Sequence, residues 1–414
     1  MPAVHTSMYR PISRIRLRLQ TAALALMLGL FAAPSAVAAD GIQVIESEVT
    51  YSFAQQVTFT LQATSDADIT QVYLFFQATG DERAQSVNVD VEQSPEISVE
   101  HTRDLRRAPL SPLATVTFWW QIENAAGLSL STEHKQFKYE DNRFQWQQLS
   151  AEGITVYWIA GRGDPAFGQA ALDIARQSVR EINAELQAPM PASIDIYIYD
   201  AQHNLDAAMV LTGRDWITGL AHPELDGILI AVPPEEGYTS RMKRYVPHEI
   251  THLLVYQAVT PDGYRYVPEW LDEGLATANE QLPTPEYALA IEEARAQGEI
   301  LPLETLCVPF SPDSRTAFLS YAQSGSVAHF IRERYGARGI RALLDAYANG
   351  ASCGSGVEEA LSTSLHGLET AWRASLEPQT RWQALFPQVG VWVGLWLLSL
   401  LVALPMIGGR RRSQ

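Results

Sequence analysis

The stretch Tyr245–Tyr256 reads YVPHEITHLLVY and combines a helical pattern with two histidines four residues apart. We place Pro247 in the first turn of this helix, where the missing N–H of proline costs no hydrogen bond. The apolar residues follow one helix face and predict that it packs against a core; they are Val246, Ile250, Leu253 and Leu254. The stretch therefore predicts a half-buried helix with both histidines on one side.

His248 and His252 at this spacing can bind one Zn²⁺ at roughly 2.0–2.1 Å from each nitrogen. Glu249 is rotated off that face, so its carboxylate can reach a metal-bound water rather than the metal, as a general base does. The alternative is a partly buried helix with two incidental histidines. A catalytic zinc site also needs a third protein ligand and an open fourth position.

Pro268–Thr277, which reads PEWLDEGLAT, offers such a ligand from a second expected helix. Glu273 is the first candidate. Glu269 lies one helical turn earlier on the same face and competes with it. Asp272 also competes, or instead accepts a hydrogen bond from a ligand histidine. Gly274 predicts close packing of this helix behind the site.

The motifs His-Glu-x-x-His and Trp-x-x-Glu-Gly-x-Ala stand together over roughly residues 240–280. In this arrangement the chain resembles the gluzincin metallopeptidases and, more closely, the bacterial membrane proteins with a peptidase MA-like domain. The resemblance implies that His248, His252 and Glu273 bind a single zinc ion and that Glu249 is the catalytic base. Such an enzyme hydrolyses the peptide bonds of a peptide or protein substrate with metal-activated water.

Amide hydrolysis also requires a hydrogen-bond donor for the oxyanion. Related enzymes take a Tyr or His from the helical half of the domain, which makes Tyr321 the first candidate and His329 the second. A packing or surface role is the alternative for each of them. His222 falls in an expected turn, where we expect it to be solvated rather than bound to the metal.

The 414 residues suffice for two folded domains. The net charge of −17, from 30 basic and 47 acidic residues, disfavours nucleic acid as a partner. Residues 1–39 have a basic start, an apolar run and small residues at the end, and they predict a cleaved secretory signal peptide. Export would permit a disulfide between Cys307 and Cys353, with two free buried thiols as the alternative.

Residues 40–145 are expected to form an all-β, immunoglobulin-like sandwich domain. Apolar and polar residues alternate in runs separated by turn residues; the runs are 49–53, 56–61, 69–76 and 114–122. Trp119 and Trp120 point to opposite faces of one strand, so one of them belongs to the core and the other is exposed or at an interface. The domain is either a binding or spacing module or has only a stabilising role.

Residues 146–380 are expected to form an α+β zincin-type (gluzincin) metallopeptidase domain. An amphipathic helix is predicted at 168–186, and everything beyond residue 280 has a helical pattern. Strand patterns precede the zinc helix; they lie at 154–158, 193–199, 216–221 and 228–232, the last two forming a hairpin. The resemblance implies that one hairpin strand is the sheet edge and pairs with extended substrate through its backbone.

Residues 386–409 carry no charge and are long enough, at about 1.5 Å per residue, to form a transmembrane helix across about 30 Å of hydrocarbon. Arginines in the tail 410–414 predict a cytoplasmic C-terminus and an extracytoplasmic catalytic domain on a single-pass anchor in the cell membrane. The leading interpretation is a membrane-anchored zinc metallopeptidase. The alternative is a catalytically inactive, peptidase-like binding module at the cell surface, and the intact Glu249 argues against it.

Overall fold

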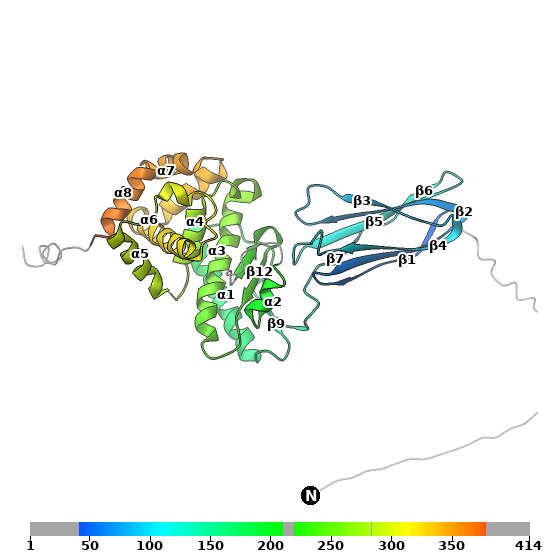
Figure 1. Ribbon diagram of the computed structural model, residues 1–414, viewed down its shortest axis with the longest axis horizontal. Helices are drawn as coiled ribbons and strands as arrows, with labels where there is room; N and C mark the ends of the chain where they lie inside the picture. Colours follow the sequence, from blue (N-terminus) through cyan, green and yellow to red (C-terminus); the bar gives the residue numbers. More distant parts are fainter. Residues whose placement is uncertain (1–40, 210–218, 283, 378–414) are drawn as a thin grey trace, which may run out of the picture.

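The computed structural model describes residues 41–209, 219–282 and 284–377 of the chain. Figure 1 shows them in three regions that follow the chain order: an all-β region, a mixed sheet with helices packed on it, and a region made of helices. The expected signal peptide, residues 1–39, lies outside the described residues.

Seven strands form the all-β region, and all of their pairings are antiparallel. The long strand β2 pairs with β1 and β4 along its first half and with β3 and β5 along its second. The ring of Phe59, in the first half, lies 5.7 Å from Phe76 and 5.2 Å from Phe118, so both halves share one core. The strands are β1 (Gln43–Ser52), β2 (Gln56–Ala78), β3 (Gln85–Val89), β4 (Ser94–Asp104), β5 (Thr115–Asn124), β6 (Ser129–Ser131) and β7 (Lys135–Lys138).

Burial alternates along β2 and β5, where the sequence pattern predicts alternating strands. Trp120 is fully buried, whereas Trp119 is partly exposed and stacks on Phe75 and His134. This confirms that only one of the two neighbouring tryptophans belongs to the core. The all-β prediction for this region is confirmed, while its immunoglobulin-like connectivity and its limits at residues 40 and 145 stay predictions.

A five-stranded sheet follows, in the order β11-β12-β10-β9-β8. Its three central strands are parallel, and the outer strands run antiparallel to their neighbours. One face packs against α1 and α3, and the other joins the core of the all-β region through Tyr197, Tyr199 and Leu229. The elements are β8 (Trp146–Ala151), β9 (Ile154–Ile159), α1 (Pro165–Leu186), β10 (Ile194–Tyr199), α2 (Gln202–Asp206), β11 (Gly219–His222), η1 (Pro223–Leu225) and β12 (Gly227–Ala231). The predicted hairpin is therefore β11 and β12, with β11 at the sheet edge.

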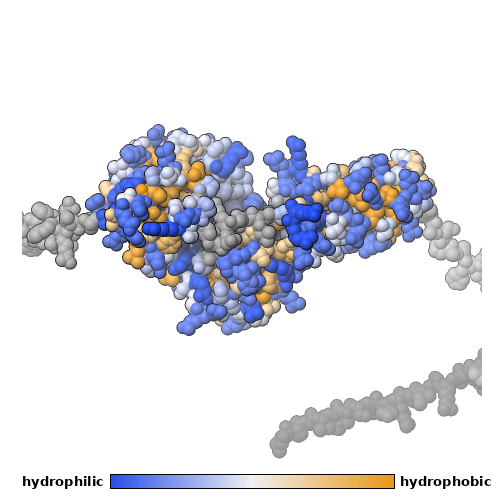
Figure 2. Space-filling view, viewed as in Figure 1, coloured by the Kyte–Doolittle hydropathy of each residue, from blue (hydrophilic) through white to orange (hydrophobic). Residues whose placement is uncertain are grey.

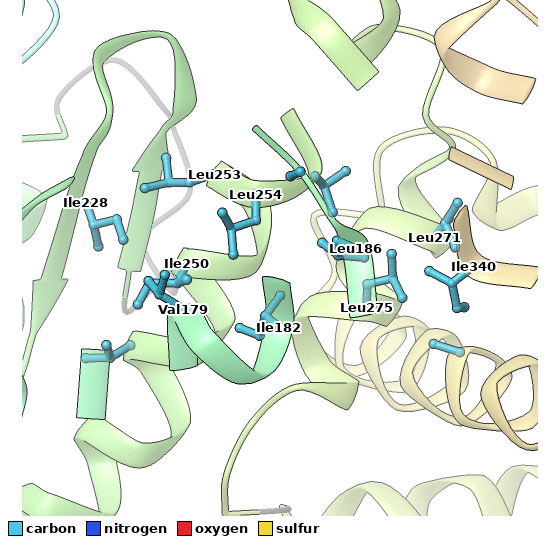
Figure 3. Packing of buried hydrophobic residues seen from close by; sticks show 14 of the residues in the cluster. Val179, Ile182, Leu186, Ile228, Ile250, Leu253, Leu254, Leu271, Leu275 and Ile340 are labelled. Carbon is cyan, nitrogen blue, oxygen red and sulfur yellow. The ribbon is translucent and has the colours of Figure 1, made fainter. Parts of the chain in front are cut away.

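The helical region begins with α3, which carries both histidines. Figure 3 shows Ile250, Leu253 and Leu254 of α3 among buried residues of α1, β12 and α4, so the predicted apolar face is confirmed. Cys307 and Cys353 form the predicted disulfide, which ties the end of η2 to the start of α7. The helices are α3 (Tyr238–Tyr264), α4 (Glu269–Ala278), α5 (Pro285–Gln297), η2 (Leu303–Leu306), α6 (Ser314–Ala348), α7 (Cys353–Leu361) and α8 (Leu365–Ser375).

The placement of Pro247 in the first turn is wrong, because α3 already begins at Tyr238. A proline inside a helix leaves the carbonyl four residues earlier without its usual donor. That carbonyl belongs to Lys243, and it accepts a hydrogen bond of 2.9 Å from the backbone N–H of Gln281 instead. The proline is tolerated because a segment beyond α4 supplies the missing donor.

The predicted fold class is wrong in its last element, the C-terminal transmembrane helix. Within the described ranges, no helix is long and apolar enough to cross a membrane. The longest of them, α6 and α3, carry charged residues, because one face packs on the core and the other contacts water. This finding contradicts the expected single-pass location in the cell membrane. The segment 386–409 and the tail 410–414, on which that expectation depended, lie outside the described residues.

Candidate metal centre

Helices α3 and α4 bring three donor atoms together. One atom each from His248 and His252 of α3 and from Glu273 of α4 lie within 4.8 Å of one another. The Nε2 atoms of the two histidines are 3.2 and 3.6 Å from Oε2 of Glu273. Glu269 and Asp272 do not join this group, so Glu273 is the described carboxylate that the fold directs toward both imidazoles.

Two glycines set the distance between α4, which carries Glu273, and α6. A Cβ atom at Gly274 would lie 2.6 Å from the carbonyl oxygen of Ser324, and one at Gly325 would lie 2.7 Å from Cγ2 of Thr277. Side chains cannot approach that closely, so the two helices touch through glycine on both sides. The predicted close packing at Gly274 is confirmed, and it holds Glu273 against α3.

The donor set fits a zinc ion. Oε2 of Glu273 is buried and, despite its short distances to the imidazoles, has no aligned hydrogen-bond partner within the described chain. A buried charged oxygen in this situation is costly unless a cation or a proton neutralises it. Two imidazole nitrogens and one carboxylate oxygen are the donors of a catalytic zinc site, which keeps its fourth position for water or substrate.

The surrounding carboxylates raise the pKa of both histidines. Burial alone would lower the pKa of His248, but the carboxylates of Glu273 and Glu280 outweigh burial and raise that pKa to about 9. The pKa of His252 is also raised well above its ordinary value, because Asp272 and Glu273 outweigh burial there. A cation that binds these nitrogens therefore has to displace protons from them.

Each imidazole has a second carboxylate on its far side. Nδ1 of His252 lies 3.1 Å from Oδ2 of Asp272, which is an ion-pair distance but lacks the alignment of a hydrogen bond. The same oxygen of Asp272 accepts a hydrogen bond of 2.6 Å from the hydroxyl of Tyr264. Nδ1 of His248 lies 3.5 Å from Oε1 of Glu280. Such outer carboxylates orient ligand histidines and make them better ligands. Asp272 lies where the second of its two expected roles would place it, next to a candidate ligand histidine, and that role stays a prediction.

Glu280 and Tyr264 are the residues that the sequence interpretation missed. Glu280 lies just beyond the end of α4, and its neighbour Gln281 makes the hydrogen bond to the Lys243 carbonyl that Pro247 leaves free. The proline inside α3 was a usable signal, because it implies that some other segment must supply a donor. Nothing in the local pattern pointed to Tyr264.

A cleft of about 500 Å³ opens beside the three donors, between β11, α3, α4 and α6. Glu249 lines it and is only 7% exposed, with its carboxylate against the edge strand. A Cβ atom at Gly219 of β11 would lie 2.4 Å from Oε1 of Glu249, so a larger residue at this position would have to displace the end of the Glu249 side chain. Burial raises the pKa of Glu249, although the neighbouring histidines His248 and His252 act in the opposite direction.

The other candidate residues differ in whether they line the cleft. Tyr321 of α6 lines the cleft, and its hydroxyl donates to Oε1 of Glu273 at 3.1 Å. His329 is exposed on α6 and does not line the cleft. The expectation that His222 is solvated is wrong, since its side chain is 14% exposed and its Nδ1 lies 3.6 Å from Oε1 of Glu224, outside the three-donor group.

Residues 174–378 match the model of the Peptidase MA superfamily. The match extends from within α1 past α8 and includes both motif helices and the cleft. It supports a zincin-like peptidase domain in this part of the chain. A comparison with curated proteins finds no match.

Similar solved structures include an aminopeptidase N family protein from Idiomarina loihiensis, with 10% identity over 74% of this chain and 71% of that one and a TM-score of 0.39. OgpA from Akkermansia muciniphila shows 14% identity over 24% of this chain, with a TM-score of 0.21. The aligned part spans 28% of the length of OgpA. The ApaA protein from Bordetella pertussis shows 17% identity over 25% of this chain and 98% of its own, with a TM-score of 0.18. These scores carry no argument about the function of this chain.

Proposed function

We propose that residues 146–380 form a zinc metallopeptidase that hydrolyses peptide bonds in peptide or protein substrates. The convergence of His248, His252 and Glu273 beside the buried Glu249 carries this proposal. The match to the Peptidase MA superfamily supports the same class of chemistry. His248, His252 and Glu273 would hold the zinc ion, which when bound lowers the pKa of water towards 7 and polarises the scissile carbonyl.

Glu249 acts as the general base. It takes a proton from the attacking water and passes it to the leaving amine, a transfer that typically contributes about 10²–10⁴ in rate. Burial raises the pKa of Glu249, and a pKa closer to the working pH suits a group that takes up a proton and then releases it. The substrate lies extended along β11, the outer strand of the sheet, which can pair with it through backbone hydrogen bonds and makes little demand on its sequence.

The contact between Gly219 and Glu249 predicts a selective defect in Gly219→Ala. The added methyl group has to displace the flexible end of Glu249, because the present geometry leaves only 2.4 Å. We expect kcat to fall by about 10–100-fold through misplacement of the base, while zinc content and thermal unfolding stay close to wild type. Gly354→Ala in α7, where the new Cβ meets open space, is the matched control. Unchanged kcat in Gly219→Ala would contradict the position proposed for the base.

Tyr321 is proposed as the donor to the oxyanion. Burial and the Glu273 carboxylate raise the pKa of its hydroxyl, so it keeps its proton and remains a donor. Tyr321→Phe is expected to lower kcat by about 10²–10³, with KM and zinc content little changed. If zinc affinity falls together with kcat, Tyr321 positions Glu273 and the assignment as oxyanion donor is wrong.

Metal removal tests the proposed function as a whole. Zinc-loaded protein is expected to cleave an unstructured protein, with products detected by mass spectrometry. A chelator should abolish cleavage and added zinc should restore it, whereas magnesium should not, because it prefers all-oxygen sites. A catalytically inactive binding module would instead take up zinc and give no products in any of these states.

A further inference from the structure

A second hollow of about 470 Å³ adjoins the catalytic cleft and lies between α5 and α6. Ser314 and Phe318 line both cavities, so the two cavities lie side by side. The ring of Phe318 lies 5.0 Å from that of Tyr287, which belongs to the wall of the catalytic cleft. We call the second cavity the α5–α6 hollow.

The α5–α6 hollow is lined by apolar side chains and has an acidic rim. Leu289 is 64% exposed and Phe318 is 39% exposed, an unusual state for large apolar side chains that share one cavity. Figure 2 shows hydrophobic residues reaching the surface of the helical region between hydrophilic ones. Three carboxylates stand at the rim, on Glu286, Glu293 and Glu299. The basic side chain there, Arg315, is itself 78% exposed and lies 3.8–4.0 Å from two of them.

We propose that the α5–α6 hollow is a remote substrate subsite, which binds an apolar side chain from a basic stretch of the polypeptide being cleaved. The inference rests on the proposed function. Phe318 lines both cavities, so a polypeptide that leaves the catalytic cleft past Phe318 would enter the hollow. The apolar lining suits an apolar side chain, and the acidic rim favours neighbouring Lys or Arg over Asp or Glu.

A subsite of this kind acts on long substrates and not on short ones. Edge-strand pairing at β11 holds the residues around the scissile bond, whatever their side chains. Contacts in the α5–α6 hollow are available only when the chain extends beyond that stretch. The preference should therefore appear as a dependence of kcat/KM on what the extension contains.

The test uses three peptides with one common core of about four residues, an extended strand of roughly 13 Å. The first is the core alone. The second carries apolar and basic extensions on both sides, and the third carries Ser-Gly extensions of equal length. Wild type is expected to prefer the second over the third by about tenfold in kcat/KM, and Leu289→Ser should remove most of that preference. Leu128→Ser, at an exposed leucine of the all-β region, should keep it.

Equal kcat/KM for the second and third peptides in wild type would overturn the proposal. So would a preference that survives Leu289→Ser while thermal unfolding shows the variant folded. Fluorescence anisotropy can measure the binding of the same peptides to Glu249→Gln, which separates this inference from the proposed function. A Leu289-dependent affinity without any cleavage by wild type would refute the enzyme and keep the subsite. Sedimentation that shows dimers, lost in Leu289→Ser, would assign the hollow to a second copy of the chain and refute the subsite.

Discussion

Glu249→Gln is expected to lower kcat for peptide hydrolysis by a factor of about 10²–10⁴, the usual contribution of a positioned general base. The amide has the shape of the carboxylate but cannot take a proton from water. Glu249 is outside the three-donor group, so zinc should remain bound. Kinetics on a cleaved peptide, together with the zinc content of the same preparation, measure both effects.

The matched control is Glu236→Gln, which removes an exposed carboxylate just ahead of α3 and should change neither quantity. Burial distinguishes the two glutamates, because only Glu249 is enclosed beside the histidines. A Glu249→Gln protein that cleaves as fast as wild type would remove Glu249 from its role and would favour another base in the cleft.

Glu273→Ala is expected to have the largest effect on the metal. Outer carboxylates such as Asp272 typically contribute about 10–100-fold to metal affinity, and loss of a direct ligand should exceed that range. Hydrolysis should disappear with the metal. Competition with a chromophoric zinc chelator measures the affinity, and the cleavage assay measures the activity of the same protein.

Glu269→Ala is the control that separates the two carboxylates considered for the third ligand. Both residues lie on α4 and line the cleft, one helical turn apart, but only Glu273 belongs to the three-donor group. Zinc affinity should therefore stay near wild type in Glu269→Ala. The opposite pattern, with affinity lost in Glu269→Ala and kept in Glu273→Ala, would exchange the roles of the two residues.

The grouping of the three donor residues could be predicted because its pattern is local. His248 and His252 lie one helical turn apart on an amphipathic helix, and any helix with that sequence presents them together. Glu273 needed one further step, since the second motif places it on a neighbouring helix whose glycine packs against α6. In each case a single helix determines where the residue lies and which way its side chain points.

Features that depend on contacts between distant segments could not be predicted in this way. The true start of α3 depends on Gln281, which accommodates the proline inside the helix. Glu280 reaches His248 only because that segment turns back over α3. The contact of Gly219 with Glu249 joins a sheet edge to a helix, and no pattern of residue spacing in the sequence predicts it. The prediction of a membrane anchor depended on the hydropathy of one segment and on no contact with another part of the chain.

Diffraction from crystals grown with zinc, recorded on both sides of the zinc absorption edge, would test the metal centre most directly. We expect one strong anomalous peak at roughly 2.0–2.2 Å from Nε2 of His248, Nε2 of His252 and a carboxylate oxygen of Glu273, with the fourth position open toward the cleft. A zinc peak elsewhere, or no peak between these residues while Glu273 faces away from the histidines, would contradict it.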